Sequence, residues 1–242
     1  MLSLRAVLPR YRPSLEQVMI IPHYRGLFLC ARKQICVLWL FIISWRKMEG
    51  ECMEKRLEDR SLEELWQLFP IFLVPHKKEW ADWYREEKGR LEVLLGAGRV
   101  KRVSHIGSTA VSGIWAKNII DILLEVLDEK RMAEVREILK NNGWLCMNTS
   151  KNRISMNKGY TEKGFAEKVY HLHIRLPCDH DELYFLSYLQ MHPAVAKEYE
   201  TLKLHLWKRY PHDRDRYTEA KTDFVRTYTE RAKREYGNRW EW

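Results

Sequence analysis

Two strand-like segments joined through a Gly-Ser-Thr turn constrain the fold of this chain more than any other feature. The stretch His105–Val126 reads HIGSTAVSGIWAKNIIDILLEV. Its aliphatic and β-branched residues predict a strand that ends at Val103–Ile106, a bridging segment at Ala110–Trp115 and a second strand at Asn118–Val126. Strands so close in sequence require a sheet, and the turn between them is a place where backbone and ligand can meet.

The turn carries groups that suit a phosphate. Gly107, Ser108 and Thr109 provide N–H and hydroxyl donors with little steric bulk. Lys117 and Asp121 follow near the start of the second strand. A cation, a carboxylate and a donor-rich turn together suit a nucleoside triphosphate with its divalent metal. The alternative is an ordinary turn followed by a solvated strand-end acid, because short Gly-rich motifs often occur without function.

The run HIGSTAV-GI-AK-IIDI resembles the signature of the GrpB family. That family is similar to the nucleotidyltransferase superfamily, and some members are fused to dephospho-coenzyme-A kinase. The resemblance extends from roughly Leu62 to Tyr236 and implies a nucleotidyltransferase-like mixed β-sheet flanked by helices. Further segments that carry it are Trp80, the HLH at His171–His173, Tyr188–Leu204 and Tyr217–Lys221.

One position departs from the pattern of the wider superfamily, in which two acids separated by one residue hold magnesium. Asp121 stands at the first position, but Leu123 occupies the second. Ser112 and Asn118 stand where relatives tend to have proline. A paired-metal site needs carboxylates from both positions, so the resemblance implies that Asp121 alone binds any magnesium and that transferase activity is weakened or absent.

Hydrophobic periodicity predicts an α+β domain at residues 53–242 that ends in a helical portion. A capping box at Ser61 and Glu64 begins a first helix, and Lys77–Leu95 follows as a longer helix with Trp80 and Trp83 in the core. The other predicted helices are Glu129–Asn142, Asp181–Gln190, Pro193–Lys208 and Asp215–Tyr236. The other predicted strands are Trp144–Asn148, Arg153–Asn157 and Val169–Leu176, with turns at Lys158-Gly159 and Lys163-Gly164.

The first 52 residues are predicted to be an N-terminal extension outside the folded domain, either a translated leader or a misassigned start. Residues 1–47 hold eight Lys/Arg and one acid, Glu16, and so carry +7 of the net charge of +9. The remainder is nearly balanced, which argues against a nucleic-acid-binding domain. The apolar run Ile35–Trp45 is shorter than the about 20 residues that a membrane-spanning helix needs. A signal peptide is the competitor, but no small-residue cleavage site follows the run.

A histidine pair is a further candidate for the same site. His171 and His173 flank one leucine and therefore point to one face of a strand. If that strand neighbours the strand of Asp121, the acid and a histidine meet over a metal, whereas the alternative is hydrogen-bonded structure. Arg175 continues the same face, where it either clamps a phosphate or a carboxylate or lies solvated.

The late helices contribute the last candidates. Tyr217 and Lys221 lie one helical turn apart, and Lys203 lies on the preceding helix. Together they offer an aromatic face and cations to a nucleotide, while the alternative is an ordinary charged helix surface.

Three functions remain open from the sequence. The first is an enzyme that transfers a nucleotidyl group with magnesium, the second is a degenerate domain that binds a nucleotide or related phosphate compound, and the third is an interaction domain that docks a coenzyme-A pathway kinase. Five scattered cysteines predict reduced thiols and a cytoplasmic location. The predicted catalytic residues are Asp121 and His173. The predicted ligand-binding residues are Gly107, Ser108, Thr109, Lys117, Arg175, Lys203, Tyr217 and Lys221.

Overall fold

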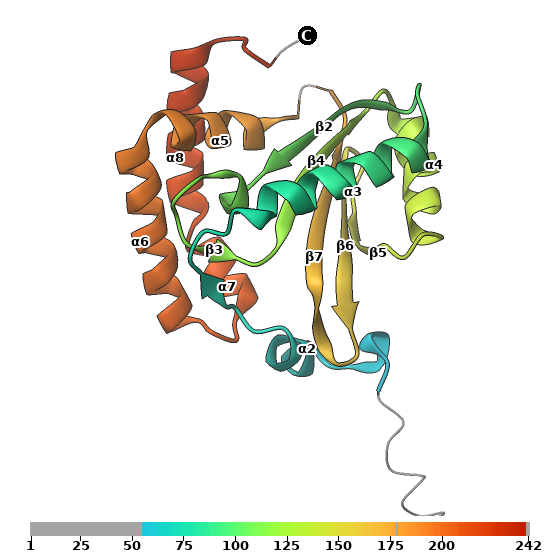
Figure 1. Ribbon diagram of the computed structural model, residues 1–242, viewed down its shortest axis with the longest axis horizontal. Helices are drawn as coiled ribbons and strands as arrows, with labels where there is room; N and C mark the ends of the chain where they lie inside the picture. The colour runs from blue at the N-terminus through green and yellow to red at the C-terminus, as the bar shows by residue number, and fades with distance from the viewer. Residues whose placement is uncertain (1–54, 178, 241–242) are drawn as a thin grey trace, which may run out of the picture. The chain divides into compact units, whose positions relative to one another are not determined.

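The computed structural model describes residues 55–177 and 179–240 (Figure 1). These residues belong to one unit of the chain. The predicted extension at residues 1–52 lies outside the described residues, as do all the cysteines except Cys146, which is an exposed free thiol. No helix in the described ranges has the length and apolar character needed to cross a membrane.

A five-stranded mixed sheet forms the centre of the fold. Its strands lie in the order β2-β4-β7-β6-β5, and β4 and β7 form the one parallel pair in this sheet. The strands are β2 Val100–Ile106, β4 Ile120–Val126, β5 Leu145–Thr149, β6 Arg153–Thr161 and β7 Gly164–Arg175. A separate short ladder pairs β1 Leu73–Val74 with β3 Ala116–Lys117.

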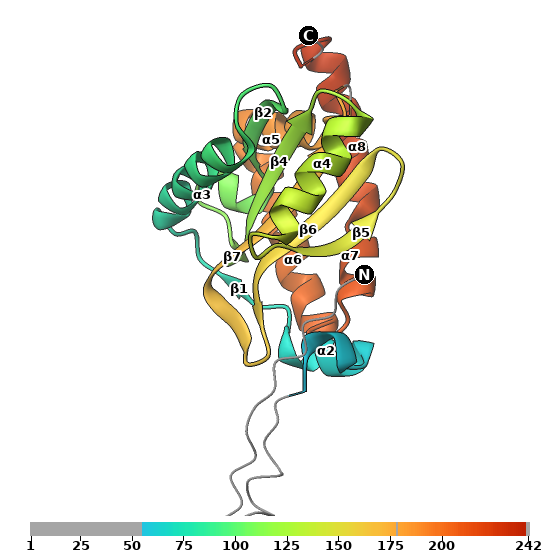
Figure 2. The ribbon, with the colours of Figure 1, turned by 90° about the vertical axis from the view of Figure 1, so that its right-hand side faces the viewer.

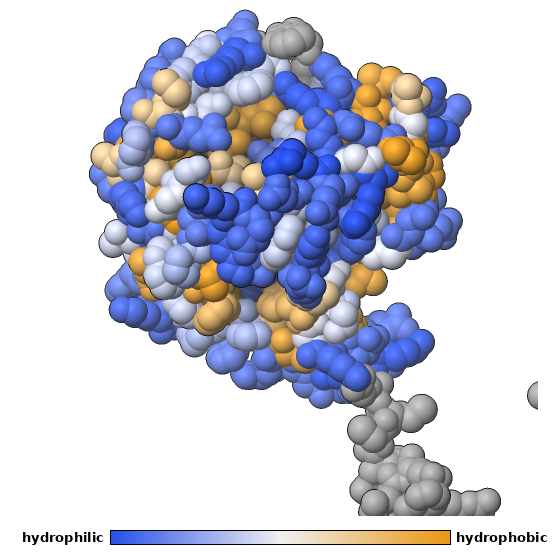
Figure 3. All heavy atoms as spheres, in the orientation of Figure 1, coloured by the Kyte–Doolittle hydropathy of each residue, from blue (hydrophilic) through white to orange (hydrophobic). Residues whose placement is uncertain are grey.

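Two helices cover one face of the sheet, α3 Glu79–Leu95 and α4 Glu129–Lys140 (Figure 2). Alternate residues of β4 point into this core, and Trp80 of α3 is fully buried there, where its indole N–H donates to Asn118 Oδ1 at 2.8 Å. The outward side of α3 is polar, and Figure 3 shows a largely hydrophilic surface where α3 crosses the sheet. The predicted core role of Trp80 is therefore confirmed.

The late helices gather beside the other face of β2 and β4 (Figures 1 and 2). They are α5 Asp181–Met191, α6 Pro193–Arg209, α7 Arg214–Glu219 and α8 Thr222–Tyr236. The edge strand β5 is exposed along its whole length. The short elements η1 Leu57–Asp59 and α2 Leu62–Leu68 precede the sheet, and the capping box at Ser61 and Glu64 is present, which stabilises such a helix by about 1 kcal/mol.

The α+β prediction is confirmed, with three local corrections. The predicted strand Asn118–Val126 begins at Ile120, because Ala116–Lys117 pairs separately with β1. The predicted turn at Lys158-Gly159 is a bulge inside β6, where a Cβ on Gly159 would collide with the Lys168 carbonyl. The predicted helix Asp215–Tyr236 is divided into α7 and α8.

Candidate functional site

The candidate site begins where β2 ends. Ile106 pairs with Asp121 on β4, and Gly107 follows with a φ of +71°, a conformation that favours glycine. A Cβ on Gly107 would lie 2.5 Å from Asp121 Oδ2. Two independent constraints therefore reserve this position for glycine. Because Gly107 has no Cβ, the backbone at the start of the turn, before η2 Ser108–Ala110, lies directly against the Asp121 carboxylate.

Gly107→Ala is expected to lower the free energy of unfolding by about 3 kcal/mol, because the new methyl group must displace the Asp121 carboxylate as well as adopt a left-handed φ. Gly113→Ala is the matched control, since Gly113 has a φ of +76° but no atom within 4 Å of the point where a Cβ would stand. It should lose only about 1 kcal/mol. Urea unfolding compares the two variants, and equal losses would show that contact with Asp121 is unimportant.

Two histidines hold Asp121. The parallel pairing of β4 with β7 sets Asp121 opposite His171, whose Nδ1 lies 3.2 Å from Asp121 Oδ1. His173 Nε2 lies 3.5 Å from the same oxygen. A carboxylate only accepts hydrogen bonds, so each of these ring nitrogens must carry a proton. The strands of Asp121 and the histidines are neighbours, and the contact between these side chains is the hydrogen-bonded alternative rather than a meeting over a metal.

The far nitrogens of both histidines also have partners. His171 Nε2 lies 2.8 Å from the Tyr160 hydroxyl and 3.4 Å from an Arg214 nitrogen, while His173 Nδ1 lies 3.5 Å from an Arg175 nitrogen. Because arginine only donates, His171 Nε2 is an acceptor and the His171 ring is neutral. Neither histidine in this arrangement has a free ring nitrogen with which to remove a proton or bind a metal.

Electrostatics support this assignment. Burial lowers the pKa of His171 to about 4, against the opposing effect of Asp121, so the ring is uncharged at neutral pH. Burial raises the pKa of Asp121, but hydrogen bonds from His171 and His173 outweigh it and hold that pKa well below its ordinary value. Asp121 is therefore a permanent anion rather than a general base.

Four cations converge on this carboxylate from separate segments. Lys117 comes from β3, Lys203 from α6, Arg214 from the start of α7 and Lys221 from the junction of α7 and α8. Burial, followed by the neighbouring cations, lowers the pKa of Lys117 and of Lys203 to about 7. Burial likewise lowers the pKa of Lys221 to about 8, with Asp121 opposing the shift. These lysines therefore lie in an electropositive, poorly solvated environment.

A tyrosine ring lies between two of the lysines. Lys117 Nζ is 5.5 Å and Lys221 Nζ is 4.5 Å from the centroid of the fully buried Tyr217 ring, distances at which a cation is attracted to the ring face. Lys203 Nζ lies 4.9 Å from the Tyr199 ring and donates to the Trp115 carbonyl. The aromatic rings thus hold the ammonium groups in place without neutralising them.

These groups line one cavity of about 490 Å³, here called the phosphate pocket, which is within the size range of small-molecule sites. Its wall contains nearly all the residues that the sequence predicted for the site. They are Gly107, Ser108, Thr109, Lys117, Asp121, His173, Lys203, Tyr217 and Lys221.

The other charged groups on the wall of the phosphate pocket are already paired. Arg153 binds Asp179 through two hydrogen bonds of 2.6 Å, Glu182 binds Arg175, and Asp181 binds Lys233. Within the described residues, by contrast, Lys117, Lys203, Lys221 and Arg214 form no ion pair with a carboxylate at 4.0 Å or less. The pocket therefore presents four cations against one carboxylate, Asp121.

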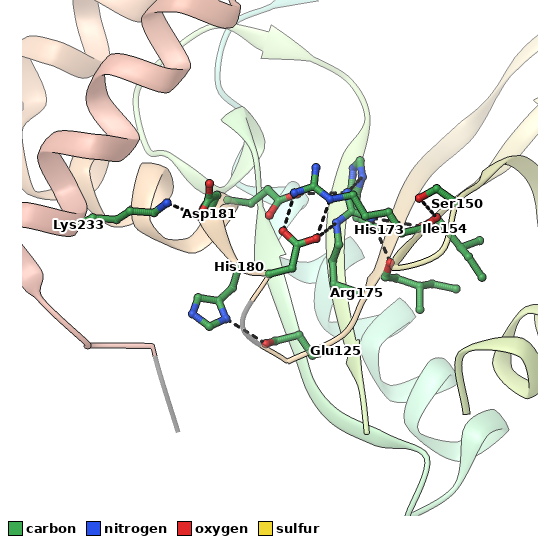
Figure 4. A network of polar contacts seen from close by, with 12 residues as sticks. Glu125, Ser150, Ile154, His173, Arg175, His180, Asp181 and Lys233 are labelled. Atoms are coloured by element: carbon green, nitrogen blue, oxygen red, sulfur yellow. Dashed lines mark hydrogen bonds and ion pairs between the residues drawn. The ribbon is translucent and has the colours of Figure 1, made fainter. Parts of the chain in front are cut away.

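Arg175 is not brought to the pocket. Figure 4 shows its guanidinium group among carboxylate oxygens and next to His173. It lies 3.2 Å from Glu182 and 3.7 Å from Asp179, donates to the Ile174 carbonyl at 3.1 Å, and is 5% exposed. The guanidinium is thus already paired with carboxylates of the protein, and its contact with the site is the one with His173. Arg175 therefore does not belong to the ligand-binding set.

The donor set does not fit magnesium. Leu123, at the position of the second acid, is fully buried and packs with Ile106 and Leu183. Magnesium prefers several oxygen ligands, whereas this site offers one carboxylate that already accepts from two histidines and is surrounded by cations. No group of three or more His, Cys, Asp or Glu side chains in the described part of the chain is arranged to hold a metal ion. The expectation of magnesium at Asp121 is therefore not supported by the geometry.

Tyr199 and Arg214 are pocket residues that sequence reasoning missed. Tyr199 lies in the segment that carries the family resemblance, but its ring was not singled out. Arg214 stands in the run RDRY, where alternating charges are typical of a solvated helix start. Only the chain reversal between α6 and α7 turns Arg214 toward His171, and no local signal predicts that.

Comparisons with known proteins agree with the resemblance. A family model described as GrpB protein matches residues 70–231. The UPF0157 protein YqkA of Bacillus subtilis is 32% identical over 176 residues, which cover 70% of this chain and 50% of YqkA. The glutamate-rich protein GrpB of Alkalihalophilus pseudofirmus is 34% identical over 162 residues, which cover 64% of this chain and 91% of that protein.

A dephospho-CoA kinase of Mycobacterium tuberculosis is 28% identical over 198 residues, which cover 72% of this chain and 47% of the kinase. The chain thus spans about half the length of YqkA and of this kinase. The crystal structure of GrpB from Enterococcus faecalis matches with a TM-score of 0.60 and 27% identity, over 68% of this chain and 99% of that one. A Cid1 poly(U) polymerase structure matches 56% of this chain and 45% of its own at 12% identity, with a TM-score of 0.41 that is too low to carry an argument.

Proposed function

Because the chain belongs to the GrpB family, we propose that its phosphate pocket binds the phosphate groups of a nucleotide or related phosphate compound, and that it does so without a metal ion. The observation that supports this proposal is the convergence of Lys117, Lys203, Lys221 and Arg214 on one cavity. They come from separate segments, so the cluster is a product of the fold rather than of one basic stretch.

The energetics favour an anionic ligand. Drawing like charges together in a poorly solvated cavity costs free energy, which the lowered pKa values of the three lysines reflect. A phosphate group carries about −1.5 to −2 charges at neutral pH and accepts several hydrogen bonds. Its binding would restore the lysines to their charged forms and satisfy the donors of the turn at Ser108 and Thr109.

In this proposal Asp121 orients the groups around the phosphate rather than taking part in a reaction. Asp121 is fixed by His171 and His173, and it in turn meets the Gly107 backbone and the field of the lysines. Two-metal transfer chemistry would need firmly held metal ions, and no group of three or more His, Cys, Asp or Glu side chains in the described residues is arranged to hold one. An active transferase remains the alternative, and docking to a kinase remains a prediction on which no contact in the structure bears.

Inorganic tripolyphosphate tests the proposal directly. We expect isothermal titration to detect binding in the presence of a chelator, because the cations of the protein neutralise the ligand in place of magnesium. Affinity should be highest below pH about 7, where Lys117 and Lys203 are protonated, and should fall as pH rises through about 8, where Lys221 also loses its proton. Binding near neutral pH should take up protons, because the anion raises all three pKa values.

Sulfate is the control ligand, because its charge is constant across this pH range and any change in its affinity reports the protein alone. If tripolyphosphate binds only when magnesium is present, metal-free binding is refuted and the metal-dependent function is favoured instead. No binding of either anion at any of these pH values would refute the proposed function.

A further inference from the structure

A second cavity adjoins the phosphate pocket. It has a volume of about 490 Å³ and lies between α2 and strands β5, β6 and β7. We call it the α2 groove. Its wall shares His171, His173 and Arg214 with the phosphate pocket, so the two cavities adjoin at these three side chains. A single elongated ligand would pass from one to the other along this wall.

The sides of the α2 groove are aromatic. Trp66 and Phe69 come from α2 and its C-terminal end, and Tyr160 comes from β6. The Phe69 and Tyr160 rings lie 4.6 Å apart between centroids, and the Tyr160 hydroxyl is fixed on His171. Phe69 and Tyr160 also contact Phe165, and Tyr160 stacks on His171. Trp66 has no such ring contact within the described residues, so its face is the one to which another ring can stack.

The floor of the groove, however, is polar. Asn148, Ser155 and Asn157 line it, and within the described residues none of the three forms a side-chain hydrogen bond. Asn157 is only 4% exposed. Its amide atoms are not among the fully buried, unpartnered polar atoms of the described residues, so they are accessible from the groove, where a ligand can supply both an acceptor and a donor.

Strand register fixes the distance between the two cavities. Asp121 pairs with His171, and His171 pairs with Asn157, so these residues form one row across β4, β7 and β6. Neighbouring strands lie about 4.8 Å apart, which puts the backbones of Asp121 and Asn157 about 10 Å apart. A ribose with its first phosphate bridges a distance of this order.

We propose that the α2 groove binds the heterocyclic ring of a nucleotide whose phosphates occupy the phosphate pocket. The ring stacks against the aromatic side of the groove, and the Asn157 amide pairs with a donor and acceptor on the edge of the ring. An alkyl or acyl group would leave this amide unpaired, and a simple sugar phosphate would leave the aromatic faces uncovered. This inference rests on the proposed function and narrows its ligand to a nucleoside phosphate.

The test compares inorganic tripolyphosphate with the four ribonucleoside triphosphates on the full chain by isothermal titration in chelator. At least one nucleotide should bind roughly 10-fold or more tightly than tripolyphosphate, because stacking and one amide pair add to the phosphate contacts. Tripolyphosphate that binds as tightly as every nucleotide would overturn the groove assignment while leaving the phosphate pocket intact. No binding by any of the five ligands would overturn both.

The Asn157→Ala variant distinguishes the contribution of the α2 groove from that of the phosphate pocket. The variant should lose most of the advantage of the preferred nucleotide and keep the affinity for tripolyphosphate, whereas Asn152→Ala, an exposed asparagine outside the groove, should change neither. Equal weakening of both ligands by Asn157→Ala would refute the assignment. If Asn157→Ala does not fold, the wild-type comparison alone decides.

Discussion

Leu123→Asp is expected to destabilise the domain strongly rather than to complete a metal site. Leu123 occupies the position of the second acid, but it is fully buried between Ile106 and Leu183. A carboxylate there has no partner and little access to water, and the leucine packing is lost as well. We expect the free energy of unfolding to fall by about 3–5 kcal/mol at neutral pH, a large part of the stability of an ordinary domain.

The pH dependence identifies the cause of this loss. Burial raises the pKa of an introduced carboxyl group above its value in the unfolded chain, so the penalty is small at acid pH and grows as pH rises. Leu123→Asn is the matched control, since it has the same shape and no charge, and its loss should not depend on pH. Urea unfolding of both variants measures the difference. A folded Leu123→Asp that binds magnesium would mean that the site opens at this position.

Replacing Lys117 and Lys221 together by methionine is expected to weaken anion binding and strengthen the fold. The double variant removes two of the four cations of the phosphate pocket, so tripolyphosphate affinity should fall by roughly 100-fold or more. The same change removes like charges from a poorly solvated cavity and keeps the apolar stems against Tyr217. The free energy of unfolding should therefore rise by about 1–3 kcal/mol.

The sign of the pH effect follows from the lysine pKa values. The unfolded chain keeps each lysine protonated up to about 10.5, whereas the folded chain releases these protons near 7 and 8. The free energy of unfolding of the wild type should therefore rise with pH between about 7 and about 10.5, and this rise should be much smaller in the double variant. Lys101→Met, on the exposed part of β2, is the control and should alter neither property. A double variant that loses both binding and stability would show that the lysines serve the fold.

The sequence predicted most of the elements and nine residues of the pocket wall, for identifiable reasons. The capping box predicted the start of α2, and the helical spacing of apolar residues predicted α3. The alternation of side chains along a strand predicted that His171 and His173 share one face, which is the face of Asp121. Local pattern is enough in these cases, because the residues that decide the structure are close in sequence.

Arg175 and Asn157 show where such reasoning ends. Arg175 shares a strand face with the histidines, but the start of α5 carries Glu182 over it, and that contact depends on how the chain returns after β7. Asn157 reads as an ordinary polar strand residue until β6 is placed beside β7 in a specific register. Both outcomes depend on tertiary neighbours, which composition and periodicity do not encode.

The parallel pairing of β4 with β7 also governs when the site forms during folding. Asp121 and His171 are 50 residues apart, and the chain between them must complete α4 and two hairpin strands before the pair closes. Contacts of long sequence separation are slow to form, because the entropy of the intervening loop is lost before the contact is gained. Early intermediates with the β2–β4 hairpin in place would still lack the histidine side of the pocket. An anion bound as proposed would therefore favour chains that have completed this pairing, the one of longest sequence separation in the five-stranded sheet.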